Sequence, residues 1–157
     1  MPILQVSRKI DYALRAVIHL ASEDDSERAC SVSEIATRER IPRQFLVKII
    51  QELIHKGLVR SRRGPHGGYV LARPAKDVTF REVIEAVEGP IHLNVCLDPA
   101  EGCNLSDDCT MHGVWKAGQE RMLEVYRATR LDQMAAPQPA RKRVSSPGAI
   151  ALPVLSH

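Results

Sequence analysis

The stretch PRQFLVKIIQELIHKGLVRSRRGPHGGYVL, residues 42–71, decides the fold of this chain. Its first half repeats apolar residues at the three-and-four spacing of an amphipathic helix, namely Leu46, Ile49, Ile50, Leu53 and Ile54. Proline is tolerated in a first helical turn, and glycine commonly ends a helix. Pro42 and Gly57 therefore bracket a helix predicted over residues 42–55.

The second half of this stretch predicts a β-hairpin. Two strand-like runs, 58–61 and 68–71, flank a connection that contains glycine and proline. The connection is also basic, because it begins with Arg62 and Arg63.

Upstream, residues 7–23 have the apolar spacing of another amphipathic helix, and a polar loop follows at 24–29. Ser31 with Glu34 forms a capping-box pattern that opens a short helix predicted over 34–40. Two short helices joined by a tight turn and followed by a basic hairpin form a winged helix-turn-helix.

Downstream, Thr79 with Glu82 predicts a second capping box, which opens a helix over 80–88 that Gly89 and Pro90 close. Residues 111–134 predict one long helix of roughly 35 Å. So small a domain cannot cover such a helix, which favours pairing with a second copy of the chain. The proline-containing, aromatic-poor remainder predicts disorder.

The fold class is therefore mostly α with a small β-hairpin: a winged helix-turn-helix plus a long C-terminal dimerisation helix. We expect a DNA-binding domain at 1–90, a cysteine-rich cluster-binding loop at 91–110, the dimerisation helix at 111–134 and a disordered tail at 135–157.

Charge is distributed unevenly along the chain, although the net charge is only +3. Residues 53–76 contain six basic residues and no acid, whereas residues 91–115 contain four acids and no lysine or arginine. The first region suits a polyanion and the second would repel it. An apolar content of 44% provides for a core, and neither a signal peptide nor a membrane span is evident, so we expect a cytoplasmic protein without a membrane partner.

The helix at 42–55 could place Arg43, Gln44 and Lys48 in a DNA major groove, where arginine and glutamine read base edges. The hairpin adds candidate contacts to phosphates or a minor groove, at Arg60, Arg62, Arg63, Gly64 and His66. The alternative is an ordinary solvated basic surface, but the order of helix, turn and basic hairpin favours double-stranded DNA as the partner.

Three cysteines, Cys96, Cys103 and Cys109, fall within one aperiodic segment, separated by six and then five residues. In the reducing cytoplasm, such thiols are more often metal ligands or redox sensors than structural disulfides. The spacing lacks the close cysteine pair of a zinc knuckle and suits an iron–sulfur cluster better. A disulfide switch, a zinc site and an inert loop remain alternatives, and Cys30 lies apart as an incidental thiol.

The wing sequence 57–71, together with DYALR at 11–15 and IEAVEG at 84–89, closely resembles the Rrf2 family of bacterial winged-helix transcription regulators. The resemblance covers about residues 5–134. It implies a homodimer whose wings reach minor grooves, with Arg63 making such a contact. Val47 stands where some members have a glutamate that helps discriminate between operators. The operator preference of those members therefore does not transfer to this chain.

The resemblance also implies a 2Fe–2S or 4Fe–4S cluster held by Cys96, Cys103 and Cys109. The usual spacing in the family is five and five residues, so this loop is one residue longer between its first two cysteines. Two residues match positions of a fourth ligand in different members: His112 from the same chain, and Asp11 from a partner chain. An ion pair of Asp11 with Arg15 and a plain helix-start role for His112 are the alternatives.

We therefore expect a regulator that senses iron, redox state or nitric oxide. An enzyme is disfavoured, because the sequence contains no nucleophile motif, phosphate loop or paired carboxylates, and no small-molecule substrate is expected. A small iron–sulfur electron carrier would explain the cysteines but would leave the helix-turn-helix and the wing without a purpose.

Overall fold

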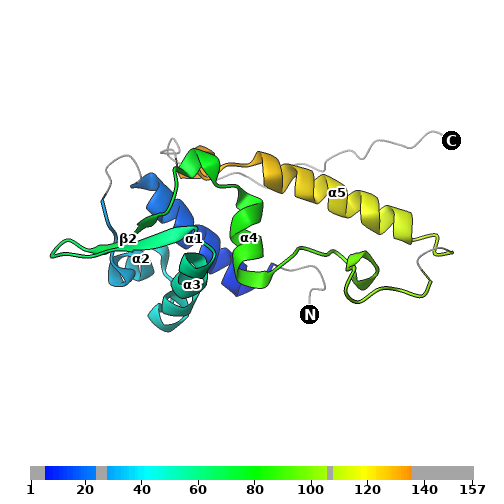
Figure 1. Ribbon diagram of the computed structural model, residues 1–157, viewed down its shortest axis with the longest axis horizontal. Coiled ribbons are helices and arrows are strands. Elements are labelled where there is room, and N and C mark those ends of the chain that lie inside the picture. Colours follow the sequence, from blue (N-terminus) through cyan, green and yellow to red (C-terminus); the bar gives the residue numbers. More distant parts are fainter. Residues whose placement is uncertain (1–5, 24–27, 106–107, 136–157) are drawn as a thin grey trace, which may run out of the picture.

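The computed structural model describes residues 6–23, 28–105 and 108–135. These residues are mostly helical, with a small antiparallel hairpin, as the sequence predicts (Figure 1). In chain order the elements are α1 (Arg8–Ser22), α2 (Val32–Glu39), α3 (Arg43–His55), β1 (Val59–Arg62), β2 (Gly68–Leu71), η2 (Ala75–Asp77), α4 (Phe80–Glu88), η3 (Val95–Leu97), α5 (His112–Ala128) and α6 (Leu131–Ala135).

The helices α1, α2 and α3 form the helix-turn-helix body around one apolar core. The buried side chains come from the predicted stripes, including Val17 of α1, Ile35 of α2 and Leu46 of α3. Ser7 caps α1 by accepting a hydrogen bond from the Ile10 amide.

The start of α2 differs from the predicted one. The helix begins at Val32 rather than Glu34, and the Ser31 hydroxyl caps it by accepting the Glu34 amide proton. The Glu34 carboxylate accepts a hydrogen bond from Arg28 at 2.8 Å, where a complete capping box would bond it to the Ser31 amide. The Glu34 carboxylate therefore binds Arg28 instead of completing the predicted capping box.

The predicted hairpin forms, but its first strand, β1, starts and ends one residue later than predicted. β1 pairs with β2 in a register from Val59 opposite Leu71 to Arg62 opposite Gly68. The backbone of Cys30 extends the pairing, since it exchanges hydrogen bonds of 3.0 and 2.8 Å with Tyr69. A Cβ on Gly68 would lie 2.5 Å from the Cys30 carbonyl oxygen, so glycine is required at this crossing.

Helix α4 has the predicted bounds, and its capping box is complete. The Thr79 hydroxyl accepts the Glu82 amide proton, while the Glu82 carboxylate accepts the Thr79 amide proton at 2.8 Å. Gly89 ends the helix with a positive φ of 83°.

The prediction of one helix over 111–134 is wrong. Helix α5 ends at Ala128, Thr129 is extended, and α6 starts at Leu131. Backbone hydrogen bonds to the segment before α4 replace helical ones: the Phe80 amide donates to the Thr129 carbonyl at 2.9 Å, and the Leu131 amide donates to the Val78 carbonyl at 3.0 Å. Leu131 is then fully buried, at 0% exposure, and α6 packs on α1.

The winged-helix body consequently includes residues beyond the predicted limit of 90, because α6 is part of its core. Ala135, the first residue of the expected tail, ends α6, and the rest of that tail lies outside the described residues. In the described ranges, no helix combines the length and apolar character needed to cross a bilayer.

Helix α5 projects away from the winged-helix body (Figure 1). The tip of the hairpin and the loop that precedes α5 lie at opposite ends of the long axis of the molecule. The acidic loop is therefore far from the basic wing.

Candidate nucleic-acid interface and cysteine loop

Helix α3 buries one face and exposes the other. Leu46, Ile49 and Leu53 are buried, whereas Arg43, Gln44 and Lys48 are exposed. The predicted groove-reading side chains thus share the solvent face of the second helix of the motif. Val47 is exposed on this face too.

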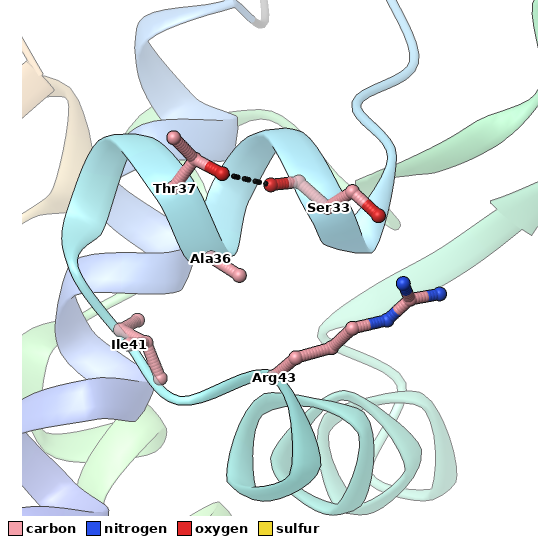
Figure 2. Close-up of a pocket in the computed structure, with 5 residues that line it drawn as sticks. All are labelled: Ser33, Ala36, Thr37, Ile41 and Arg43. Carbon is pink, nitrogen blue, oxygen red and sulfur yellow. Dashed lines mark hydrogen bonds between the residues drawn. The ribbon is translucent and has the colours of Figure 1, made fainter.

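A hollow of about 330 Å³ separates α2 from the start of α3 (Figure 2). Arg43 extends across its mouth, and the Ser33 hydroxyl opens toward the same side. The Thr37 hydroxyl is occupied, because it donates to the Ser33 carbonyl at 2.8 Å. Arg43 and Ser33 together give this end of the motif donors suited to a phosphate or a base edge.

Four basic residues of this surface have no acidic partner among the described residues. In the described parts of the chain, the side chains of Arg43, Lys48, Arg60 and Arg63 form no ion pair or hydrogen bond. Several other basic residues pair with acids, as in Arg15–Asp11, Arg73–Glu82 and Arg81–Glu85. These unpaired cations of α3 and the hairpin are therefore available to a polyanion.

The tip of the hairpin is a tight turn that displays its side chains. The Gly67 amide donates to the Gly64 carbonyl at 2.9 Å, and Gly64 has a φ of 123°, which L-residues with a side chain rarely adopt. Arg62, Arg63 and His66 are all exposed. The wing residues named from the sequence thus lie at the tip and along β1.

The cysteine loop is held by local turns. Cys96 lies within η3, which the Asn94 side chain caps by accepting the Val95 amide proton. Gly102, with a φ of 68°, turns the chain just before Cys103. The Cys109 carbonyl accepts the His112 amide proton at 3.1 Å, which links the end of the loop to α5.

A cavity of about 450 Å³ lies between this loop and the first turns of α5. Cys96, Cys103 and His112 line it, together with Lys116 and Gln119 of α5. The His112 Nδ1 atom is buried without a hydrogen-bond partner, which is costly for a ring nitrogen.

Two predicted ligands do not line the cavity. Cys109 is only partly exposed and contributes its backbone instead. Asp11 lies on α1, where it binds Arg15 at 2.7 Å, as the alternative interpretation of its sequence position anticipated. Over the described residues, the loop cysteines and His112 do not converge as closely as a single metal ion requires, because the one such group lies elsewhere.

Three residues near the cavity were missed from the sequence. Lys116 and Gln119 follow His112 by one and two helical turns, so the helical period could have placed them on its face. Gln119 also ties the loop to α5, since its side-chain oxygen accepts the Leu93 amide proton at 2.8 Å. His92, 3.9 Å from Asp98, has a buried Nδ1 without a partner and gave no signal in the sequence.

An exposed recognition helix, a basic hairpin and the order of elements together define a winged helix-turn-helix protein of the DNA-binding class. Comparison with known proteins agrees. The sequence profile of the Rrf2 family, described as "Iron-dependent Transcriptional regulator", matches residues 6–137. The chain belongs to the Rrf2 family and is a transcriptional regulator rather than an enzyme.

Three relatives illustrate the range of the family. An rrf2-like HTH-type transcriptional regulator of Rhodobacter capsulatus is 34% identical over 145 residues, which cover 87% of this chain and 97% of that protein. CymR, the global cysteine regulator of B. subtilis, has a TM-score of 0.69 at 28% identity, over 87% of this chain and all of that one. T. potens IscR has a TM-score of 0.67 at 28% identity, over 84% of this chain and 87% of that one.

Proposed function

We propose that this protein is a cytoplasmic, homodimeric regulator that binds a double-stranded DNA operator and senses iron, redox state or nitric oxide through an iron–sulfur cluster in the loop before α5. Cys96, Cys103 and Cys109 would supply thiolates, and His112 the fourth ligand. The carrying observation is the cavity that Cys96, Cys103 and His112 line together, where the Nδ1 atom of His112 has no hydrogen-bond partner. The likeness to T. potens IscR supports the proposal.

The donor set fits a 2Fe–2S or 4Fe–4S cluster better than a single ion. Soft thiolates are the usual ligands of such clusters, and one nitrogen ligand is compatible with them. A cluster spreads its ligands farther apart than one metal ion does, which agrees with the open loop. When bound, the cluster would supply redox and ligand-exchange chemistry at an iron that lacks a fourth thiolate.

His112 is a better fourth ligand than Asp11 in this chain. His112 lines the same loop cavity as two cysteines and its Nδ1 atom has no hydrogen-bond partner, whereas the Asp11 carboxylate is neutralised by Arg15. Recruiting Asp11 would require that ion pair to break.

The exposed face of α5 supports the homodimer. Val114 and Val125 lie three helical turns apart and are 71% and 61% exposed, and Leu123 is the buried residue of this helix. An exposed apolar helix face is typical of an interface. The equivalent helix of a second copy is the simplest partner.

The signal would pass from the loop through α5 to the body. Gln119 ties the loop to α5, and at the other end Tyr126 packs against Phe80, with ring centroids 5.1 Å apart. A change in loop shape could therefore shift α5 relative to α4, and with it the spacing of two recognition helices in a dimer.

Anaerobic purification tests the proposal most directly. Visible absorbance, iron and sulfide analysis and native mass measurement would report cluster, stoichiometry and dimer together. We expect Cys103→Ser and His112→Ala to lose cluster stability, while Cys30→Ala, a matched cysteine outside the loop, and Asp11→Asn retain it.

Operator binding of cluster-loaded and cluster-free protein provides the functional readout. We expect the two forms to differ in affinity and Cys103→Ser to match the cluster-free form. Equal affinity of all three would refute cluster sensing, although DNA binding itself would stand.

A cluster-free thiol regulator is the second candidate. The likeness to CymR, whose name refers to cysteine regulation, favours it, as do the free thiols of Cys96, Cys103 and Cys109. Operator affinity that responds to a thiol oxidant but not to iron and sulfide would support this candidate over the cluster.

A further inference from the structure

A second group of metal-ligating side chains lies inside the winged-helix body. A ring nitrogen of His19, the Sγ of Cys30 and a carboxylate oxygen of Glu34 lie within 4.8 Å of one another. His19 and Cys30 are buried, and Glu34 is partly exposed. Among the described residues, this is the one group of histidine, cysteine and acidic side chains that converges so closely.

The two nitrogens of His19 have different surroundings. Nδ1 lies 2.9 Å from the Glu39 carboxylate, whereas Nε2 is buried without any partner in a residue that is only 6% exposed. Histidines that bind metal through one nitrogen usually donate the other N–H to a carboxylate, which fixes the tautomer. His19 and Glu39 show this arrangement, which leaves the Nε2 lone pair for a ligand.

We propose that His19 Nε2, Cys30 Sγ and the Glu34 carboxylate bind a zinc-like divalent transition metal ion, with water as the fourth ligand. One imidazole, one thiolate and one carboxylate are donors that suit Zn²⁺ and its neighbours. Arg28 binds the Oε1 atom of Glu34, so Oε2 remains for the ion. The partial exposure of Glu34 gives solvent a route to the site.

The electrostatics fix the proton balance of binding. Burial raises the pKa of the Cys30 thiol, and the nearby Glu34 charge raises it further. The thiol is therefore protonated without an ion, and binding releases its proton to solvent as the metal–sulfur bond forms.

Such an ion would cross-link the DNA-reading body. His19 belongs to α1, Glu34 to α2, and the Cys30 backbone pairs with Tyr69 of the wing strand β2. Because these ligands converge only in the folded chain, the ion would stabilise it and hold the wing against the helices. This site is separate from the cysteine loop and does not depend on a cluster there.

Cobalt titration of the full chain tests the site. The parent protein would carry Cys96→Ser, Cys103→Ser and Cys109→Ser, which removes the loop thiolates; none of these residues is buried, so folding should persist. We expect Co²⁺ to produce a thiolate-to-cobalt absorption band that saturates at a single equivalent and is displaced by Zn²⁺. The melting temperature should rise with Zn²⁺.

Single substitutions in that parent then test each role. Cys30→Ser should abolish the thiolate band, and Glu34→Gln, at a partly exposed position, should weaken Co²⁺ binding without unfolding the chain. Glu39→Gln, which alters only the support of His19, should weaken it by about 10- to 100-fold. Circular dichroism would confirm folding of each variant.

A folded parent without a thiolate–cobalt band would overturn the proposal. A band that survives Cys30→Ser, or a Co²⁺ affinity unchanged in Glu34→Gln, would overturn it as well. Since the parent lacks the loop cysteines, none of these results bears on the cluster proposed above.

Discussion

Individual side chains decide the predicted DNA contacts, because Arg43 of α3 and Arg63 of the wing have no acidic partner among the described residues. Arg43→Ala should weaken operator binding by about 1–3 kcal/mol and relax the sequence preference at one position, if Arg43 reads a base edge. Fluorescence anisotropy with operator and scrambled duplexes would measure both effects. Arg121→Ala, an exposed arginine of α5 that pairs with Glu124, is the matched control.

Arg63→Ala should act differently, because the wing is expected to contact the backbone or the minor groove. We expect weaker binding to all duplexes and a shallower dependence of affinity on salt, by about one unit of the log–log slope. An unchanged salt dependence would argue against a backbone contact for Arg63.

The residues of the cavity show how far the sequence alone could reach. Cys96, Cys103 and His112 were identifiable from the sequence because cysteine and histidine are common metal ligands and these three residues lie close together in the chain. Placing Lys116 beside the cavity required knowing where α5 begins. His19 and Glu34 lie on two different helices and Cys30 lies in the segment just before the second one, so only the tertiary structure brings them together.

At the scale of elements, local signals predicted the structure well. Caps, prolines and glycines act within a few residues, so α3, the hairpin and α4 were placed to within a residue. The break between α5 and α6 was missed because its cause is not local. Thr129 and Leu131 leave the helix to bond with residues 78–80, and no glycine or proline marks the site.

The crossing of Cys30 and Gly68 gives a sharp stability test. Gly68→Ala should lower the free energy of unfolding by about 1–3 kcal/mol, because its Cβ would collide with the Cys30 backbone. Gly113→Ala is the matched control, since it lies in α5 with open space around it; that change should stabilise by up to about 1 kcal/mol. Urea denaturation would compare the two.

The capping box of α4 should make stability depend on pH. Burial disfavours the charged form of Glu82, but hydrogen bonds from Arg73 and Thr79 outweigh it and lower the pKa of Glu82 below its ordinary value. A depressed carboxyl pKa stabilises the fold above about pH 4.5, and this contribution is lost as the pH falls through the folded-state pKa.

The variant Glu82→Gln isolates that contribution, because glutamine can still accept the Thr79 amide bond. Wild type should be the more stable protein at neutral pH, and the difference should shrink in acid. A difference that stays constant from neutral to acid pH, by urea denaturation, would contradict the assignment. Thr79→Ala should cost about 1 kcal/mol at either pH.

At the scale of the whole molecule, α5 is expected to mediate self-association. Val114→Glu should shift a dimer toward monomer, because two charges would meet in an apolar seam. Its side chain is exposed in the single chain, so the monomer should remain folded. Sedimentation at several concentrations would show the shift, with Lys116→Gln as an α5 control. A dimer unaffected by Val114→Glu would place the interface elsewhere.

The return of the chain at Leu131 has a practical consequence for protein engineering. The winged-helix unit is discontinuous in sequence, because its core takes a fully buried leucine, Leu131, from beyond the cysteine loop and α5. A fragment that stops at residue 90 would expose the surface that α6 covers, and we expect it to aggregate. A soluble minimal unit would instead need residues 129–135 grafted back, for instance by replacing the intervening segment with a linker. The cysteine loop and α5 are thus an insertion within the winged-helix domain, which flanks them on both sides.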